Sequence, residues 1–156
     1  MLQKLISSKI MPITLAQVKS HLRLEHADED EYLGFLIQGA TEAVQHHIGR
    51  SLMMQTWQKV YYQEQSYSNQ ISKQSILPNL ISLSYPPFVK ITQMIGCKKS
   101  GMPQEIKHYR LKFRGDLAVV EIDQAFVKVD VIYEAGYGDR PEDIPTDIRQ
   151  VILQLV

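Results

Sequence analysis

The chain has 156 residues, which is enough for one compact domain with a hydrophobic core and too few for two large ones. Hydrophobic residues make up 44% and charged residues 22%, as in ordinary soluble domains, which excludes disorder as the general state of the chain. Lys plus Arg and Asp plus Glu number 17 each, and this zero net charge counts against a protein whose main task is to grip nucleic acid.

The sequence shows none of the features that mark a secreted or membrane protein. Its first residues lack the apolar core and the cleavage site of a signal peptide. No apolar run approaches the ~20 residues that a transmembrane helix needs. The single cysteine, Cys97, excludes an intrachain disulfide. We therefore expect a soluble protein without a membrane partner.

Two helices are predicted before residue 50. Thr14 and Gln17 have the spacing of a capping box, which begins a short helix that runs to about Leu22. A longer helix is predicted from Glu29 to Ile48, and Gly49 follows it as the expected residue after a helix end. The apolar residues of this longer helix recur at helical spacing: Leu33, Leu36, Ile37, Ala40, Val44 and Ile48.

An antiparallel β section is predicted between Gln55 and Tyr133, where β-forming residues alternate with polar ones. The candidate strands are residues 55–62, 80–83, 89–95, 109–113, 117–122 and 127–133. Prolines flank residues 80–83, so an edge strand is expected there. The polar stretch from Glu64 to Ser75 is predicted to be a loop that becomes ordered on contact with a neighbour.

The last helix is predicted from Ile144 to Val156, and its apolar stripe runs to the final residue, from which we expect a truncated helix. Because helices bracket the strands, the sequence predicts one α+β domain, residues 1–156. Its N-terminal helices (12–50) and C-terminal helix (144–156) are expected to form a small bundle. The antiparallel β section (52–134) is then an insertion between them.

Side chains capable of catalysis or metal binding occur singly or in pairs. Glu42 and His46 share a helix face, but two ligands are fewer than a zinc site needs. Cys97 has no sequence cue for a His partner. The acidic run from Asp28 to Glu31 lacks the pattern of a calcium loop and suits the positive end of a helix dipole. The sequence therefore predicts no catalytic residue, no cofactor and no metal.

One short row of basic residues is a candidate partner-facing or DNA-facing surface. It consists of Lys107, Arg110, Lys112 and Arg114 and is called the basic strand below. Residues two apart point to the same side of a strand, and the other side presents Tyr109, Leu111 and Phe113. The row is either a solvated sheet face or a contact with an acidic surface, such as another subunit or the phosphates of passing DNA.

Three stretches stand in a set order along the chain. They are Pro12 to Leu24 ahead of the long helix, Ile48-Gly49-Arg50-Ser51-Leu52 with Gln55-Thr56-Trp57, and Tyr133 to Gly138 followed by Ile144-Pro145-Thr146-Asp147-Ile148. Tyr85-Pro86-Pro87 adds a fourth, with Phe88 intervening before Val89. Together they resemble the phage head–tail connector (adaptor) proteins of long-tailed phages, prophages and gene transfer agents.

The resemblance implies a structural subunit of the virion neck, assembled in the cytoplasm of the bacterial host. It implies a homo-oligomeric ring of about twelve copies beneath the portal protein. Such a ring joins the DNA-filled head to a tail-completion or stopper protein and lines the passage for double-stranded DNA. The long helix and the last helix are expected to supply much of the surface between subunits. The alternatives are another neck or tail-completion protein and a small DNA-binding module.

Overall fold

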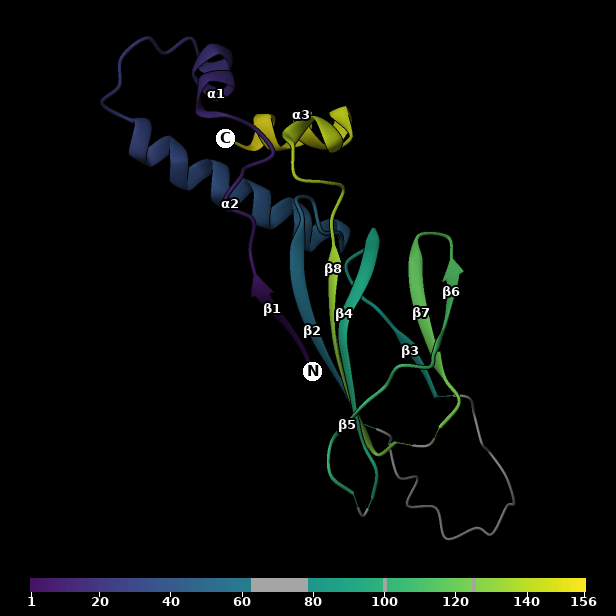
Figure 1. Ribbon diagram of the computed structural model, residues 1–156. Coiled ribbons are helices and arrows are strands. Elements are labelled where there is room, and N and C mark those ends of the chain that lie inside the picture. The colour runs from purple at the N-terminus through teal and green to yellow at the C-terminus, as the bar shows by residue number, and fades with distance from the viewer. Residues whose placement is uncertain (63–78, 100, 125) are drawn as a thin grey trace, which may run out of the picture.

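The computed structural model describes residues 1–62, 79–99, 101–124 and 126–156. Within these residues, three α-helices lie together at one end of a set of eight strands (Figure 1). The predicted α+β class is confirmed. None of the helices in the described part combines the length and the apolar character needed to cross a bilayer. The predicted polar loop, Glu64 to Ser75, lies outside the described residues.

The helices begin and end close to where local signals predict. They are α1 (Leu15–Leu22), α2 (Asp30–Ile48) and α3 (Thr146–Leu155), with a short 3₁₀ helix, η1 (Pro141–Asp143), before α3. The predicted capping box is present, because Thr14 Oγ1 accepts from the Gln17 amide at 3.2 Å and Gln17 Oε1 accepts from the Thr14 amide at 2.8 Å. Gly49 ends α2 at a φ of 64°, a conformation that glycine adopts without strain.

One hydrophobic cluster unites the three helices. Val18 of α1, Ile37 of α2 and Ile152 of α3 are at least 97% buried in it. Short helices are marginal in water, so their stability depends on this shared packing. The other buried members are Ile13, Leu33, Ala40, Val44, Leu52, Met53 and Ile144.

The strands form two antiparallel sheets. They are β1 (Leu2–Ile6), β2 (Gln55–Tyr62), β3 (Asn79–Ser82), β4 (Phe88–Cys97), β5 (Gln104–Glu105), β6 (Arg110–Arg114), β7 (Leu117–Ile122) and β8 (Lys128–Ala135). The five-stranded sheet has the order β1-β2-β8-β4-β5, and the three-stranded sheet has the order β3-β7-β6. The sequence did not predict β1, whereas β3 is an edge strand as expected.

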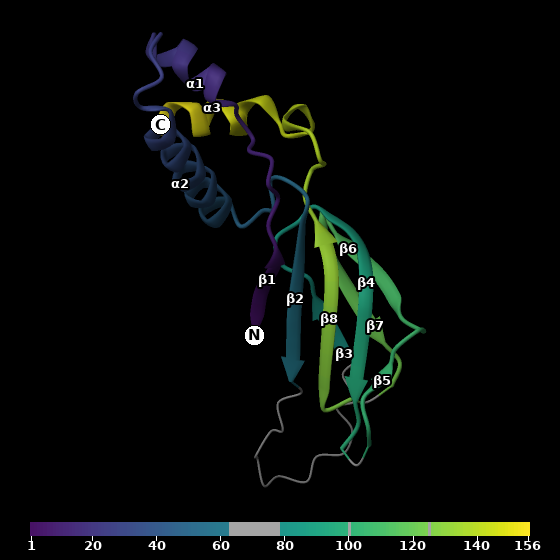
Figure 2. The same cartoon turned by 60° about the vertical axis from the view of Figure 1, so that its left-hand side comes forward.

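The two sheets share a second hydrophobic cluster. Every other residue of β8, from Val129 to Ala135, is buried, as the alternation in the sequence predicts. Ala118, Val120 and Ile122 of β7 enter the same cluster from the other sheet. The sheets overlap one behind the other in Figure 2, with the helices beyond one end of the strands. The helical part and the β section thus each have their own buried cluster. That residues 1–156 form a single domain stays a prediction.

Candidate functional site

Three of the four family-like stretches of the sequence meet in one place, the junction between the helices and the sheets. The linker after α2 lies against the segment after β8, where the Met54 amide donates to Gly138 O and the Tyr137 amide donates to Leu52 O, both at 3.0 Å. The Pro86-Pro87 turn joins them, because its carbonyls accept from the Ser51 amide at 3.0 Å and the Gly136 amide at 2.9 Å. We call these three segments (residues 50–54, 85–87 and 136–138) the junction.

Glycine is required at two places in the junction. Gly136 has a φ of 147°, which side chains rarely tolerate, and a Cβ there would lie 2.4 Å from Met53 O. A Cβ on Gly138 would overlap the carboxylate of Asp143, which accepts from the Arg140 amide at 3.1 Å. Gly136 therefore lets the linker backbone come close to the segment after β8, and Gly138 does the same for Asp143 of η1. Both glycines also help to end β8.

Side chains also join the helical and the β parts. Trp57 of β2 donates from Nε1 to Ser51 Oγ at 2.8 Å and stacks on Tyr85, with ring centroids 4.3 Å apart. Arg50 donates to Tyr137 Oη at 3.1 Å and forms an ion pair with Asp116 in the turn between β6 and β7. Partial burial works to lower the pKa of Arg50, but Asp116 and Tyr137 together outweigh burial and raise the pKa.

The basic strand lies on an outer edge of the β section. Arg110, Lys112 and Arg114 belong to β6, the edge strand that pairs only with β7 in the three-stranded sheet, while Lys107 precedes it. All five residues of β6 are exposed, including Leu111 and Phe113 on the side that the sequence marks as apolar. Phe113 is 58% exposed, and its ring lies near that of Phe88 at the start of β4, with ring centroids 6.1 Å apart.

Most of the charge of the basic strand is already paired. Lys112 Nζ lies 2.7 Å from Glu121 of the neighbouring strand β7, and Arg110 lies 3.1 Å from Asp123. Lys107 lies 3.5 Å from Glu105. Arg114 is the member of the row with no ion-pair partner in the part of the chain that the structure describes. The basic strand therefore presents alternating positive and negative charges and not a continuous positive surface. Its contact with a partner or with DNA stays a prediction.

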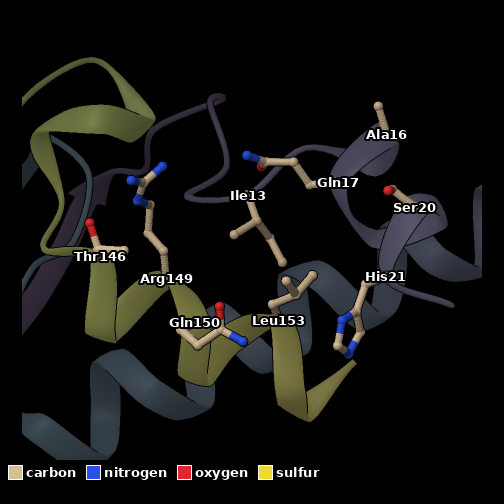
Figure 3. A pocket seen from close by; sticks show the side chains of 9 residues that line it. All are labelled: Ile13, Ala16, Gln17, Ser20, His21, Thr146, Arg149, Gln150 and Leu153. Atoms are coloured by element: carbon tan, nitrogen blue, oxygen red, sulfur yellow. The ribbon is translucent and has the colours of Figure 1, made fainter.

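A groove of about 550 Å³ separates α1 from α3 (Figure 3). One wall is a face of α1 and the other a face of α3, whose lining residues recur at helical spacing. Ile13 and Leu153 face each other between the walls, and Arg149 and His21 supply polar groups (Figure 3). Arg149 Nε is buried and has no hydrogen-bond partner among the described residues. The remaining lining residues are Ala16, Gln17, Ser20, Thr146 and Gln150.

The residues considered for metal binding and catalysis do not come together. His46 Nδ1 lies 3.2 Å from Tyr85 Oη, at the edge of the junction. In the described ranges, no three His, Cys, Asp or Glu side chains are grouped as metal ligands. In the acidic run at the start of α2, Asp30 forms an ion pair with Lys19 of α1 at 2.7 Å, and Glu29 makes no side-chain capping bond. The features best suited to a function are therefore surfaces: the groove, the exposed side of α2 and the β6 edge.

Comparisons with known proteins agree with this picture. Residues 12–83 match the model of the family described as phage gp6-like head-tail connector protein, which confirms the resemblance seen in the sequence. The matched region runs from the entry to α1 through β3 and contains one of the three junction segments, residues 50–54, while the second begins just beyond its end. No curated protein sequence matches the chain.

Solved structures with the same fold come from gene transfer agent (GTA) particles. A chain in the virion of the native GTA particle has a TM-score of 0.76 at 16% identity, over 99% of this chain and 82% of that one. A chain in the neck of the empty particle, computed with C6 symmetry, has a TM-score of 0.74 at 16% identity with the same coverage. One in the neck of the native particle, computed with C12 symmetry, has a TM-score of 0.70 at 17% identity, over 99% and 80%. At such identities the likeness shows that the fold is shared.

Proposed function

We propose that this chain is a structural head–tail connector (adaptor) subunit of a tailed phage or a phage-like particle. One observation carries the proposal: the family match over residues 12–83 and the fold shared over 99% of the chain lead independently to neck proteins. The role is mechanical, so we infer that the chain works through binding surfaces and has no catalytic site. Its place in this proposal is the virion neck, after assembly in the cytoplasm of the bacterial host.

The proposed assembly is a ring beneath the portal protein, with double-stranded DNA passing through its centre. Cyclic symmetry in the necks of similar particles, up to C12, supports a ring of about twelve copies. The ring would hand the DNA on to a tail-completion or stopper protein. A chain of zero net charge suits a conduit, because every contact between a basic side chain and a phosphate would add a salt-dependent attraction that holds back the moving DNA.

The junction suits the mechanical role. It ties the linker after α2 to the β section by three backbone hydrogen bonds and by the Arg50–Asp116 ion pair. Both parts therefore move as connected bodies when either one is pulled by a neighbour. We infer that the helices face other copies in the ring and that the β section projects toward the outside or the tail.

Two alternatives fit less well. A different neck or tail-completion protein would share the particle but occupy another position in it. A DNA-binding module would need cations that are free to meet phosphates, and three of the four cations in the basic strand have carboxylate partners instead.

Deleting the gene in a cell that produces the particle tests the role. We expect DNA-filled heads without attached tails, and tail attachment restored by a plasmid copy of the gene. Electron microscopy of the particles gives the readout. Normal tailed particles from the deletion strain contradict a connector role, and tails that attach but never mature indicate a different neck or tail-completion protein.

A further inference from the structure

The side of α2 that faces away from the other helices carries two large exposed aromatic side chains. Tyr32 is 62% exposed and Phe35 is 65% exposed. The buried stripe of α2 includes Leu33 and Ile37. At 3.6 residues per turn, Phe35 lies about 200° around the helix from each of them. Phe35 therefore points away from the shared cluster, and most of the surface of both aromatic side chains faces water on an isolated chain.

Tyr32 and Phe35 lie about one helical turn apart on α2, so their exposed surfaces adjoin, and adjoining exposed apolar surface is typical of interaction sites. Exposed aromatic residues that cluster on one helix face are typical anchors of protein interfaces, because each one buries a large area at a small loss of rotamer freedom. Glu29 and Glu31 lie beside the pair at the start of α2, and neither has an ion-pair partner within the described ranges. The exposed face is therefore both aromatic and acidic.

The groove between α1 and α3 has the complementary character. Its volume of about 550 Å³ falls within the ~300–1,000 Å³ of ordinary small-molecule pockets. Ile13 and Leu153 make its interior apolar. Arg149 supplies a buried Nε without an acceptor, and a carboxylate from a neighbour can provide one.

The two surfaces lie on opposite sides of the helical layer. α2 packs against α1 and α3 through its buried stripe. The groove lies between α1 and α3, and its lining residues Ile13 and Leu153 also contact the shared cluster. Both views show α1 and α3 on the same side of α2 (Figures 1 and 2). A contact between two different patches on opposite sides is heterologous, and such contacts close into rings when the rotation allows.

We propose that the outer face of α2, centred on Tyr32 and Phe35, docks into the α1–α3 groove of a second copy of this chain. The aromatic rings fill the apolar interior, and an acidic residue at the start of α2 meets Arg149. The inference rests on the proposed ring, since it names the contact that builds it.

Cysteine cross-linking of the full-length chain tests the contact. In a Cys97→Ser background, Phe35→Cys is combined in turn with Ala16→Cys and Gln150→Cys, one on each wall of the groove. The proteins are treated with a short bis-maleimide and run on a denaturing gel, both as purified chain and within particles. The control combines Phe35→Cys with Phe113→Cys, which lies on β6 at the far part of the molecule.

We expect a ladder of covalent oligomers from at least one groove pair and no ladder from the control pair. Dimers from Phe35→Cys alone would mean that two α2 faces meet each other, which overturns the inference. Rings seen by electron microscopy without a ladder also overturn it but leave the connector role intact. Absence of the chain from particle necks, together with absence of rings, removes the connector role and the inference with it.

Substitution of the anchor gives a second, quantitative readout. Phe35→Ala is expected to raise the protein concentration needed for ring formation by roughly tenfold or more, as for anchor residues in other interfaces. Phe113→Ala removes the same side chain from a similarly exposed position and is expected to change that concentration less than about twofold. Equal effects of the two substitutions contradict the assignment. Mass photometry across a dilution series measures both.

Discussion

Replacing Gly136 with alanine is expected to loosen the junction and to destabilise the whole chain. The backbone of Gly136 has a φ of 147°, and the added methyl group would stand 2.4 Å from Met53 O and 2.7 Å from the Met54 Cα. Neither neighbour is the end of a flexible side chain that can turn aside. The linker between α2 and β2 must therefore move, and the Tyr137–Leu52 and Met54–Gly138 hydrogen bonds move with it.

The expected loss follows from two contributions. A non-glycine residue in this region of φ and ψ costs about 1–3 kcal/mol. Forcing the overlapping backbone apart adds about 1–3 kcal/mol, as in other overpacked sites. The sum, about 2–6 kcal/mol, is a large part of the roughly 5–15 kcal/mol that stabilises a typical domain. With a urea dependence of about 2 kcal/mol/M, the unfolding midpoint should fall by about 1–3 M.

Urea unfolding of Gly136→Ala, followed by circular dichroism, measures this loss. Gly34→Ala is the matched control, because Gly34 lies in α2 and a Cβ there meets nothing within 4 Å. Alanine favours a helix interior, so the control should gain about 0.5–1 kcal/mol. A Gly136→Ala chain as stable as the wild type would refute the close approach that defines the junction.

Three further outcomes are expected. Arg50→Ala should lower the free energy of unfolding by about 1–2 kcal/mol. Asp116→Ala should then cost little more in the Arg50→Ala background, because the ion pair is already lost. A double-mutant cycle by urea unfolding in which the two losses add in full would contradict this. Burial raises the pKa of Tyr133, so above about pH 10 the unfolded chain loses a proton that the folded chain keeps, and the free energy of unfolding should fall as the pH rises. Tyr133→Phe should make this fall less steep. Equal dependence of the free energy of unfolding on pH in the two chains, measured by urea unfolding between about pH 9 and 11, would contradict this. A plot of the logarithm of the binding constant for a short DNA duplex against the logarithm of the salt concentration should have a slope shallower than about −2, because most cations of the basic strand are paired. Fluorescence anisotropy measures the binding constant. A slope of about −4 or steeper would show that the chain has a DNA-binding face.

The helices were predictable because their signals are local. The capping box at Thr14 and the glycine after Ile48 each act within one turn of the helix end, and the structure reproduces both. The alternation in β8 was predictable for a similar reason, since a central strand buries every other residue regardless of its partner.

The pairing of the strands was not predictable from the sequence. β1 was missed because it is a short edge strand whose partner is distant, with Leu2 opposite Lys59 in β2. The division into two sheets depends on pairs such as Ile81 with Val120, which no local pattern encodes. The paired charges of the basic strand follow from the same register, because Lys112 meets Glu121 only once β6 lies beside β7.

The candidate surfaces were visible in part. Tyr32 and Phe35 fall outside the apolar stripe of α2, so their exposure could have been predicted from the helical spacing of that stripe. The groove could not be anticipated, because its two walls come from opposite ends of the chain. The family-like stretches were recognised as a pattern, and the structure shows that three of the four contact one another at the junction, whereas the first forms α1.

A cryo-electron microscopy map of the neck of particles that contain this chain tests the connector role most directly. We predict a cyclic ring immediately below the portal into which the described fold fits once per subunit, with the helices of neighbouring copies in contact. A map whose ring below the portal has another fold, with this chain in the tail or absent from the particle, would contradict it.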